Sequence, residues 1–360
     1  MSLSISGVFE KWYSEIKRLR PTERKTRKRN FAWLLTGIFL SKSIHLSKIA
    51  GKIPGKATAT SIERRLSRFL DNTAIRVRKW YESIAKDVLI GIAKSVREIR
   101  LIVDGTKIGF GHQLLMVSVA YRRRAIPIAW TWVNCKRGHS SGYKQLALLA
   151  YVRRLLPVGI QVLLVGDSEF GGVDVLKTLN RWKWKYVLRQ KASHLVKIAG
   201  QKNWQPFGSL ITKPDQCLWF GKGLLTQTHS YAVNLLAYWQ VGEKAPWLLA
   251  TNLPNRRAAL AAYRRRMWIE EMFGDLKKHG FDLESTHLRH FMRLSRLTLA
   301  AVLLYVWLVA FGSQVSKAGL RRLVDRADRR DLSIFHIGCK MIDRCLTNSL
   351  SFATTFVLYT

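Results

Sequence analysis

Two aspartates follow short apolar runs that are typical of buried strands. Asp104 comes directly after Ile99–Val103 in the sequence IVDGT, and Asp167 follows Gln161–Val165 in LLVGDSEF. Carboxylates at the carboxyl ends of neighbouring strands point into one crevice, where ligands of open α/β sheets usually bind. Two such carboxylates repel each other unless a cation lies between them, and all-oxygen ligands favour Mg²⁺ or Mn²⁺. Either aspartate alone could equally be a turn former or a helix cap.

A third acid lies in a basic segment, YRRRMWIEEMFGDLKK, at residues 263–278. On one α-helix, four of its side chains would fall within about 60° of each other around the axis. These four are Tyr263, Arg266, Glu270 and Lys277. A phenol, a guanidinium and an ammonium can bind phosphate oxygens while a carboxylate completes a metal shell, so the stripe suits a metal that meets a phosphodiester. The alternative is a solvated basic helix with ion pairs between its own side chains.

The segments that must position these acids alternate between strands and helices. The expected strands are Ile99–Val103, Gln113–Tyr121, Ala125–Val133, Gln161–Val165 and Lys185–Gln190, and the expected helices are Tyr143–Leu156 and Val173–Trp182. This order predicts an α/β fold, a mixed sheet flanked by helices, and it is the order of the RNase H-like core. Residues 192–254 indicate a small β-rich insertion, and helical periodicity returns from Arg256 to Ser316.

The N-terminal 96 residues read as helical. Apolar residues recur at helical spacing in Val8–Leu19, Phe31–Leu40 and Ile75–Val96. Between the last two, a short helix at Leu46–Ala50, a Gly/Pro turn and a capped helix at Ser61–Leu70 resemble a helix-turn-helix. The second of these helices carries Arg64, Arg65 and Arg68, which we expect to contact DNA. A plain helical bundle with solvated arginines is the alternative.

These readings divide the chain into three predicted parts. Residues 1–96 form a helical DNA-binding domain, residues 97–316 form the RNase H-like catalytic core with its insertion, and residues 317–360 form a helical tail. The stretch from Leu297 to Ser316 is uncharged and long enough to span a bilayer, but it is interrupted by polar residues near its end. We expect it to be a helix buried inside the protein.

Charge and cysteine content narrow the partner and the compartment. Lys and Arg number 61 against 23 Asp and Glu, which gives a net charge of +38. Self-repulsion of this size is usually relieved by a polyanion, with nucleic acid the leading candidate and a membrane surface the second. The four cysteines, at 135, 217, 339 and 345, form no CxxC pair and no zinc-type spacing, which favours a reducing compartment.

The spacing Tyr-x2-Arg-x3-Glu-x6-Lys, downstream of two strand-end aspartates, resembles the signature of the DDE transposases of bacterial insertion sequences, in the group named for insertion sequence four. The DGT and GDSEF contexts of the aspartates and the β-rich insertion agree with that pattern, and the resemblance covers roughly residues 30–315. It implies that Asp104, Asp167 and Glu270 are a catalytic triad that binds Mg²⁺, with Mn²⁺ able to substitute.

The same resemblance implies roles for four further residues. Tyr263, Arg266 and Lys277 would contact phosphates at the transposon end. Trp247, in the closing segment WLLATNLP of the insertion, would stack on a base flipped out near the cleavage site. The alternative for Trp247 is an aromatic of the insertion's core.

We therefore expect a cytoplasmic, nucleoid-associated DNA transposase without a membrane partner. It would bind double-stranded DNA at the inverted-repeat ends of its element, cleave it, and join the 3′-OH ends to target DNA by two-metal-ion phosphoryl transfer. The resemblance implies a homodimer on paired ends. An RNase H-like endonuclease without strand transfer, a DNA-binding regulator with an inactive core and a membrane protein built around Leu297–Ser316 are the competing hypotheses.

The excess of positive charge leads to a prediction about salt. If DNA is the partner, the association constant should fall by on the order of 10³–10⁵ between about 50 and 200 mM salt, because roughly six to ten neutralised phosphates release their counterions. Fluorescence anisotropy with labelled duplex DNA at several salt concentrations measures this slope. A nearly flat dependence would point away from nucleic acid.

Overall fold

The chain forms two compact units in the computed structural model, which describes residues 5–109, 111–134, 139–354 and 356–358. The helical unit comprises Met1–Ser95, Lys107–His112 and Phe273–Thr360. The sheet unit comprises Val96–Thr106 and Gln113–Met272. The two units are defined by how the chain packs, whereas the three parts predicted from the sequence are defined by function. The division into three functional parts therefore stays a prediction.

One ten-stranded mixed sheet is the framework of the sheet unit, with the strand order β3-β2-β1-β4-β5-β10-β9-β8-β6-β7. Strands β1, β4 and β5 are parallel to one another, whereas β2 pairs with β3 and β5 pairs with β10 in antiparallel fashion. The strands are β1 (Glu98–Ile108), β2 (His112–Tyr121), β3 (Arg124–Val133), β4 (Gln161–Gly166), β5 (Lys185–Arg189), β6 (Leu195–Ile198), β7 (Gln205–Pro206), β8 (Gln216–Leu225), β9 (Tyr231–Trp239) and β10 (Trp247–Thr251).

The predicted α/β fold is confirmed, and the order β3-β2-β1-β4-β5 is that of an RNase H-like core. The β-rich residues 192–254 continue the same sheet, because β10 returns from the insertion and pairs beside β5. Two side chains secure this junction at Tyr186 of β5. Thr251 Oγ1 donates to its carbonyl oxygen at 2.6 Å, and Asn252 Oδ1 accepts from its N–H at 2.9 Å.

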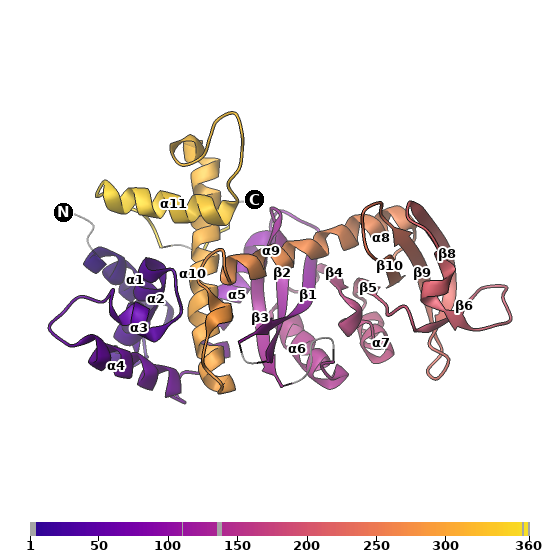
Figure 1. The fold of residues 1–360 in the computed structure, drawn as a ribbon, viewed down its shortest axis with the longest axis horizontal. Helices are drawn as coiled ribbons and strands as arrows, with labels where there is room; N and C mark the ends of the chain where they lie inside the picture. The colour runs from indigo at the N-terminus through magenta and orange to yellow at the C-terminus, as the bar shows by residue number, and fades with distance from the viewer. Residues whose placement is uncertain (1–4, 110, 135–138, 355, 359–360) are drawn as a thin grey trace. The chain divides into compact units, whose positions relative to one another are not determined.

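Helices cover both faces of the parallel strands, as buried parallel strands require. Figure 1 shows α6 (Gly142–Leu155) and α7 (Val173–Arg181) on one side of the sheet, and α8 (Arg256–Tyr263) with the start of α9 (Met267–Leu276) on the other. The amphipathic pattern of α7 explains its orientation, since its apolar residues, Val173, Val175, Leu176 and Leu179, are all buried.

The helical unit is built around one long helix, α10, which contacts α2, α4, α5 and α11. Its helices are α1 (Ile5–Leu19), α2 (Lys25–Ser41), α3 (Leu46–Ala50), α4 (Ala59–Asp71), α5 (Val77–Ala93), α10 (Phe291–Lys317) and α11 (Ile334–Thr347). Among the described residues, α10 is the one helix long and apolar enough to cross a membrane, but 94% of its most apolar window is buried. The expected packing of Leu297–Ser316 inside the protein is therefore observed.

A buried arginine joins α10 to the end of α4. The Arg296 side chain is 1% exposed, and it donates from Nη1 to the Leu70 carbonyl oxygen at 2.7 Å and from Nε to the Ile75 carbonyl oxygen at 3.1 Å. Carbonyls at the carboxyl end of a helix have no partner within the helix, so a cationic donor there satisfies them and complements the helix dipole. The N-terminal helices thus depend on a residue more than 200 positions later in the chain.

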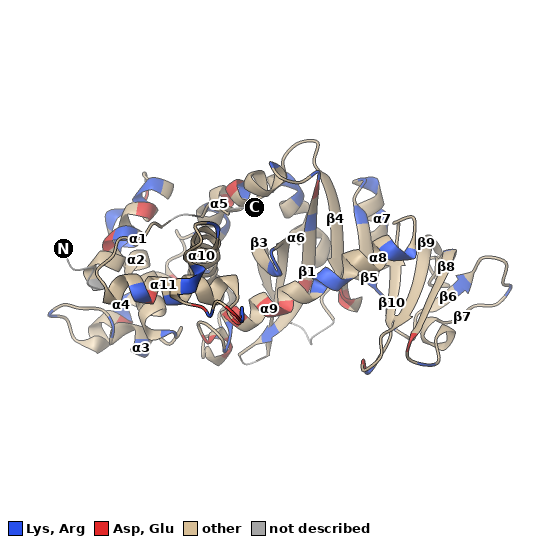
Figure 2. Cartoon of the chain, turned by 90° about the horizontal axis from the view of Figure 1, so that it is seen from above, with Lys and Arg blue, Asp and Glu red and all other residues tan. Residues whose placement is uncertain are grey.

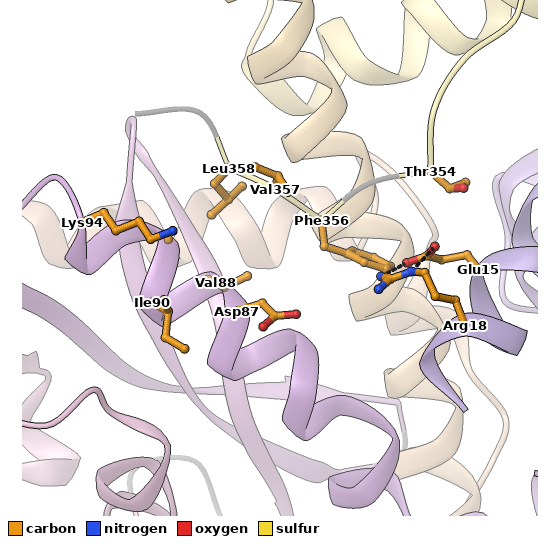
Figure 3. A pocket seen from close by; sticks show the side chains of 11 residues that line it. Glu15, Arg18, Asp87, Val88, Ile90, Lys94, Thr354, Phe356, Val357 and Leu358 are labelled. Carbon is orange, nitrogen blue, oxygen red and sulfur yellow. Dashed lines mark hydrogen bonds and ion pairs between the residues drawn. The ribbon is translucent and has the colours of Figure 1, made fainter. Parts of the chain in front are cut away.

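A hollow of about 510 Å³ opens between α1, α5 and the C-terminal segment of the helical unit (Figure 3). Val88 and Phe356 line it together with the ion pair between Glu15 and Arg18, whose charged atoms are 2.6 Å apart.

Helices α10 and α11 approach closely through two glycines. A Cβ added to Gly338 would lie 2.0 Å from the Leu308 carbonyl oxygen, and one added to Gly312 would lie 2.0 Å from the Ile334 carbonyl oxygen. No side chain larger than hydrogen fits at either position without separating the two helix backbones.

Gly338→Ala should therefore destabilise the protein by about 1–3 kcal/mol, because the added methyl group overpacks the crossing. Gly91→Ala on α5 is the matched control, since a Cβ there meets nothing within 4 Å. That control should be neutral or gain up to about 1 kcal/mol from helix propensity. Denaturant unfolding of both variants measures the difference, and equal stability would contradict a close crossing.

Candidate active site

The two aspartates lie where the parallel pairing of β1 and β4 ends. Val103 and Gly166 are the last partners in this ladder, so Asp104 and Asp167 are the next residues on neighbouring strands. The prediction that the first strand stops at Asp104 was wrong, because β1 runs on to Ile108 beside β2. Asp104 is consequently held by strand backbone on both sides.

Glycine is required at the end of β4. A Cβ on Gly166 would lie 2.8 Å from Cγ1 of Val103 and 3.1 Å from Cδ2 of Leu188, so the neighbouring strands leave no room for a side chain. The chain then turns into a short 3₁₀ helix, η1 (Ser168–Phe170), which Asp167 caps by accepting from the Glu169 N–H at 2.9 Å. The cap fixes the Asp167 carboxylate beside the strand end.

Arg266 links two of the predicted acids. Its Nη1 donates to Oδ2 of Asp104 and lies 3.5 Å from Oε1 of Glu270. Asp104 is 1% exposed and its Oδ1 accepts from the Gly105 N–H at 2.7 Å, whereas Glu270 is partly exposed. The structure therefore brings Asp104, Arg266 and Glu270 into contact.

The charge of Asp167 also acts on this group. Burial raises the pKa of Asp104 above its ordinary value, Arg266 opposes the shift, and the charges of Asp167 and Glu270 add to it. The same three carboxylates raise the pKa of Arg266 against the opposing effect of burial. Asp104 inside β1, Asp167 just after β4 and Glu270 on α9 thus form one cluster of negative charge that acts on a single guanidinium.

The donor chemistry of this cluster fits a hard divalent cation, since each acid offers oxygen and the buried Asp104 needs positive charge beside it. In the described ranges, however, no three His, Cys, Asp or Glu side chains are arranged as a metal cage. Both oxygens of Asp104 are already hydrogen bonded, one of them to Arg266. A metal ion that binds Oδ2 of Asp104 would therefore compete with Arg266 for that oxygen.

The prediction that the signature residues lie on one continuous α-helix was wrong. Between α8 and α9 the three residues Arg264–Arg266 form a 3₁₀ turn, η3. Side chains three apart eclipse in a 3₁₀ helix, so Tyr263 and Arg266 lie on one side of the turn. Helix α9 ends at Leu276, and the expected helical run to Ser316 is broken by turns and loops before α10 begins at Phe291.

Lys277 lies just beyond α9. Its Nζ donates to the Lys107 carbonyl oxygen at 3.0 Å and is 3.7 Å from Glu284, and all three residues belong to the helical unit. The turn that follows the helix is tight and needs glycine, because a Cβ on Gly280 would lie only 1.9 Å from the Asp275 carbonyl oxygen.

Trp247 stands at the start of β10 against two tyrosines. Its ring lies edge-on to Tyr263, with ring centroids 5.0 Å apart, and to its cross-strand partner Tyr238 at 5.6 Å. Trp247 is half-buried, whereas Tyr263 is buried and its hydroxyl finds no hydrogen-bond partner among the residues that the structure describes. Burial raises the pKa of Tyr263 to about 12, so the phenol is protonated at neutral pH and can donate a hydrogen bond.

The N-terminal arginines lie on α4 as the sequence indicated. Arg64 and Arg68 are exposed, and Arg65 is half-buried. Arg64 and Arg68 line a hollow with four hydroxyl side chains, those of Thr58, Thr60, Ser61 and Ser67. Thr58 caps α4 by accepting from the Ser61 N–H at 3.3 Å.

Comparison with known proteins decides the family. The family described as "Transposase DDE domain" matches residues 97–307, more than half of the chain. The chain belongs to the transposase DDE domain family. No curated protein matches the sequence.

Two solved structures are similar at low identity. One is a cryo-EM structure of the piggyBac transposase synaptic complex with hairpin DNA, at 8% identity and a TM-score of 0.44, covering 99% of this chain and 83% of that one. The other is Marinitoga piezophila Argonaute with guide RNA and target DNA, at 8% identity and a TM-score of 0.24, covering 72% of this chain and 38% of that one. TM-scores this low carry no argument about function.

The transposase DDE domain of this chain contains a polar group that the sequence reasoning gave no role. Glu169 follows Asp167 by two residues and binds the side chain of Gln113 and the backbone of Ser140. Gln113 and Gln145 are both buried, at 1% and 3% exposure. A glutamine inside the apolar strand HQLLMVSVAY was the available signal, because buried amides need partners.

The position of Trp247 leads to a prediction about the DDE domain. If the half-buried ring receives an unstacked base, Trp247→Ala should slow second-strand cleavage more than first-strand nicking, by at most the roughly 1–3 kcal/mol of one stacked base. Trp247→Phe should keep most of the second-strand rate.

Trp182→Ala, at the C-cap of α7, removes another half-buried tryptophan and is the control. Melting temperatures are measured beside both cleavage rates. A destabilised Trp247→Ala protein in which both rates fall equally would assign the ring to packing alone.

Proposed function

We propose that this chain is a DNA transposase that cleaves the ends of its own element and joins their 3′-OH groups to target DNA. The observation that carries the proposal is the buried Asp104 inside a transposase DDE domain: it accepts a hydrogen bond from Arg266, which also pairs with Glu270, and the charge of Asp167 acts on it. The sequence signature Tyr-x2-Arg-x3-Glu-x6-Lys supports placement in the group named for insertion sequence four.

Asp104, Asp167 and Glu270 would hold two Mg²⁺ ions, for which Mn²⁺ could substitute. When bound, these ions would activate the attacking oxygen and stabilise the leaving oxygen of the phosphodiester. Arg266 would then exchange its contact with Asp104 for a phosphate oxygen, because a guanidinium binds either anion through the same N–H groups. The protonated, unpartnered Tyr263 hydroxyl is suited to donate to a second phosphate oxygen.

Basic residues beside the acid cluster support DNA as the substrate. Figure 2 shows Lys and Arg along α8 and the segment that follows it. Arg256, Arg257 and Arg264 are exposed there, and Arg265 is half-buried. Exposed arginines in a row next to a carboxylate cluster suit a phosphate backbone that must be held against a metal site.

Recognition of the element's ends is proposed for α4. Arg64 and Arg68 face a hollow rich in hydroxyl groups, and such donors position a protein on DNA phosphates. Lys277 would contribute a further phosphate contact from beyond the end of α9. The active species would be a homodimer on paired ends, working in the cytoplasm at the nucleoid.

The triad is tested with a plasmid that carries the DNA flanking the coding sequence on both sides. Asp104→Asn, Asp167→Asn and Glu270→Gln should each abolish cleavage in Mg²⁺ while DNA binding is retained, since each removes one charged metal ligand. Gel electrophoresis of excised and joined products, with anisotropy for binding, measures both effects.

Glu271→Gln is the matched control for Glu270. Glu271 is 58% exposed and its carboxylate lies 3.2 Å from Arg124, so its loss should leave cleavage unchanged. Near wild-type cleavage in any of the three triad variants would remove that residue from the site. Cleavage without joined products would support an endonuclease instead of a transposase.

A further inference from the structure

Glu169 lies two residues after Asp167, and each of its own polar atoms makes a hydrogen bond. Its side-chain Oε2 accepts from Nε2 of Gln113 on β2 at 2.7 Å, and its Oε1 accepts from the Ser140 N–H at 2.8 Å. Its backbone N–H donates to Asp167, and its carbonyl oxygen accepts from Nε2 of Gln145 on α6 at 2.9 Å. One residue of η1 therefore joins β2, the start of α6 and the Asp167 carboxylate.

The bridge between Glu169 and Gln113 also presses against the backbone beside Asp104. A Cβ on Gly105 would lie 2.4 Å from Nε2 of Gln113 and 3.1 Å from Oε2 of Glu169. The Gly105 N–H in turn donates to Oδ1 of Asp104 at 2.7 Å. The same bridge thus lies against the backbone next to Asp104 and is joined to Asp167 through the Glu169 N–H.

A fourth carboxylate this close to the cluster could be a metal ligand, but its hydrogen bonds argue otherwise. Each of its oxygens accepts from a donor within 2.8 Å, and one of those donors belongs to the almost fully buried Gln113. Moving Glu169 onto a metal would leave a buried amide and a backbone N–H without these bonds, which is unfavourable.

We propose that Glu169 is a positioning residue of the active site. It locks η1 against β2 and the start of α6, and thereby fixes the direction of the Asp167 and Asp104 carboxylates without binding the metal or the DNA. This inference rests on the proposed function, because it assumes that these two aspartates bind a divalent cation.

An exchange of two side chains separates positioning from ligation. In Glu169→Gln combined with Gln113→Glu, the amide at 169 can accept from Ser140 and donate to the carboxylate at 113, so both of these hydrogen bonds are kept while the charge moves to β2. Gln113→Glu alone instead places two carboxylates, both acceptors, against each other, and Glu169→Gln alone removes the charge and leaves two amides that can still hydrogen bond.

Mn²⁺ binding to the full chain, followed by the electron paramagnetic resonance of free Mn²⁺, is the readout and needs no turnover. Gln113→Glu and Glu169→Ala should weaken Mn²⁺ binding by about 10–100-fold, the usual effect of losing a partner that orients a ligand. The exchanged double variant should return to within about threefold of wild type. Glu271→Gln, which removes an exposed carboxylate of the same unit, should bind as wild type does.

The outcomes are distinct. A double variant that melts like wild type but still binds Mn²⁺ at least tenfold more weakly would make Glu169 a ligand and overturn the proposal. Unchanged binding in Glu169→Ala and Gln113→Glu would overturn it as well. Asp167→Asn is measured in parallel, and if that variant binds Mn²⁺ normally, the proposed metal site itself is wrong.

Discussion

A carboxylate that is almost entirely buried is unstable as an anion unless positive charge lies beside it, and Asp104 imposes this condition on the sheet unit. Arg266 meets the condition by donating to Asp104 from η3, the 3₁₀ turn between α8 and α9. Glu270, one turn further along, then lies within reach of the same guanidinium. The cluster follows from the need to neutralise one buried charge.

The rigidity of the surrounding backbone makes this arrangement precise enough for chemistry. Gly166 lets β4 lie tightly between its neighbours, and the cap formed by Asp167 sets the first turn after the strand. On the opposite side, the 3₁₀ turn before α9 aligns Tyr263 with Arg266, and Trp247 packs edge-on against the Tyr263 ring. Sites held by strands and short helical turns keep their geometry better than sites on long loops.

The helical unit is held together by contacts between segments that lie far apart in the sequence. Arg296 of α10 satisfies carbonyls at the end of α4, and the α10–α11 crossing depends on glycines of both helices. The N-terminal helices and the segment Phe273–Thr360 therefore share one core. Helix α10 contacts α2, α4, α5 and α11 within this core. For this reason a stretch long enough to span a bilayer is buried by protein instead.

The sequence by itself determined the α/β class, the core strands and helices to within a few residues, and the residue types of the candidate site. These depend on local periodicity and on motif spacing, which are properties of neighbouring residues. The length of β1 and the break between α9 and α10 were missed, because a strand is extended by pairing with β2 and a helix is followed by the tight turn at Gly280. Only the tertiary structure could decide that Arg266 contacts Asp104 and that Glu169 bridges β2 and α6. The same holds for the contacts of Lys277 with Lys107 and Glu284. The reason is that these contacts form when the folded chain brings together residues that are not neighbours in the sequence.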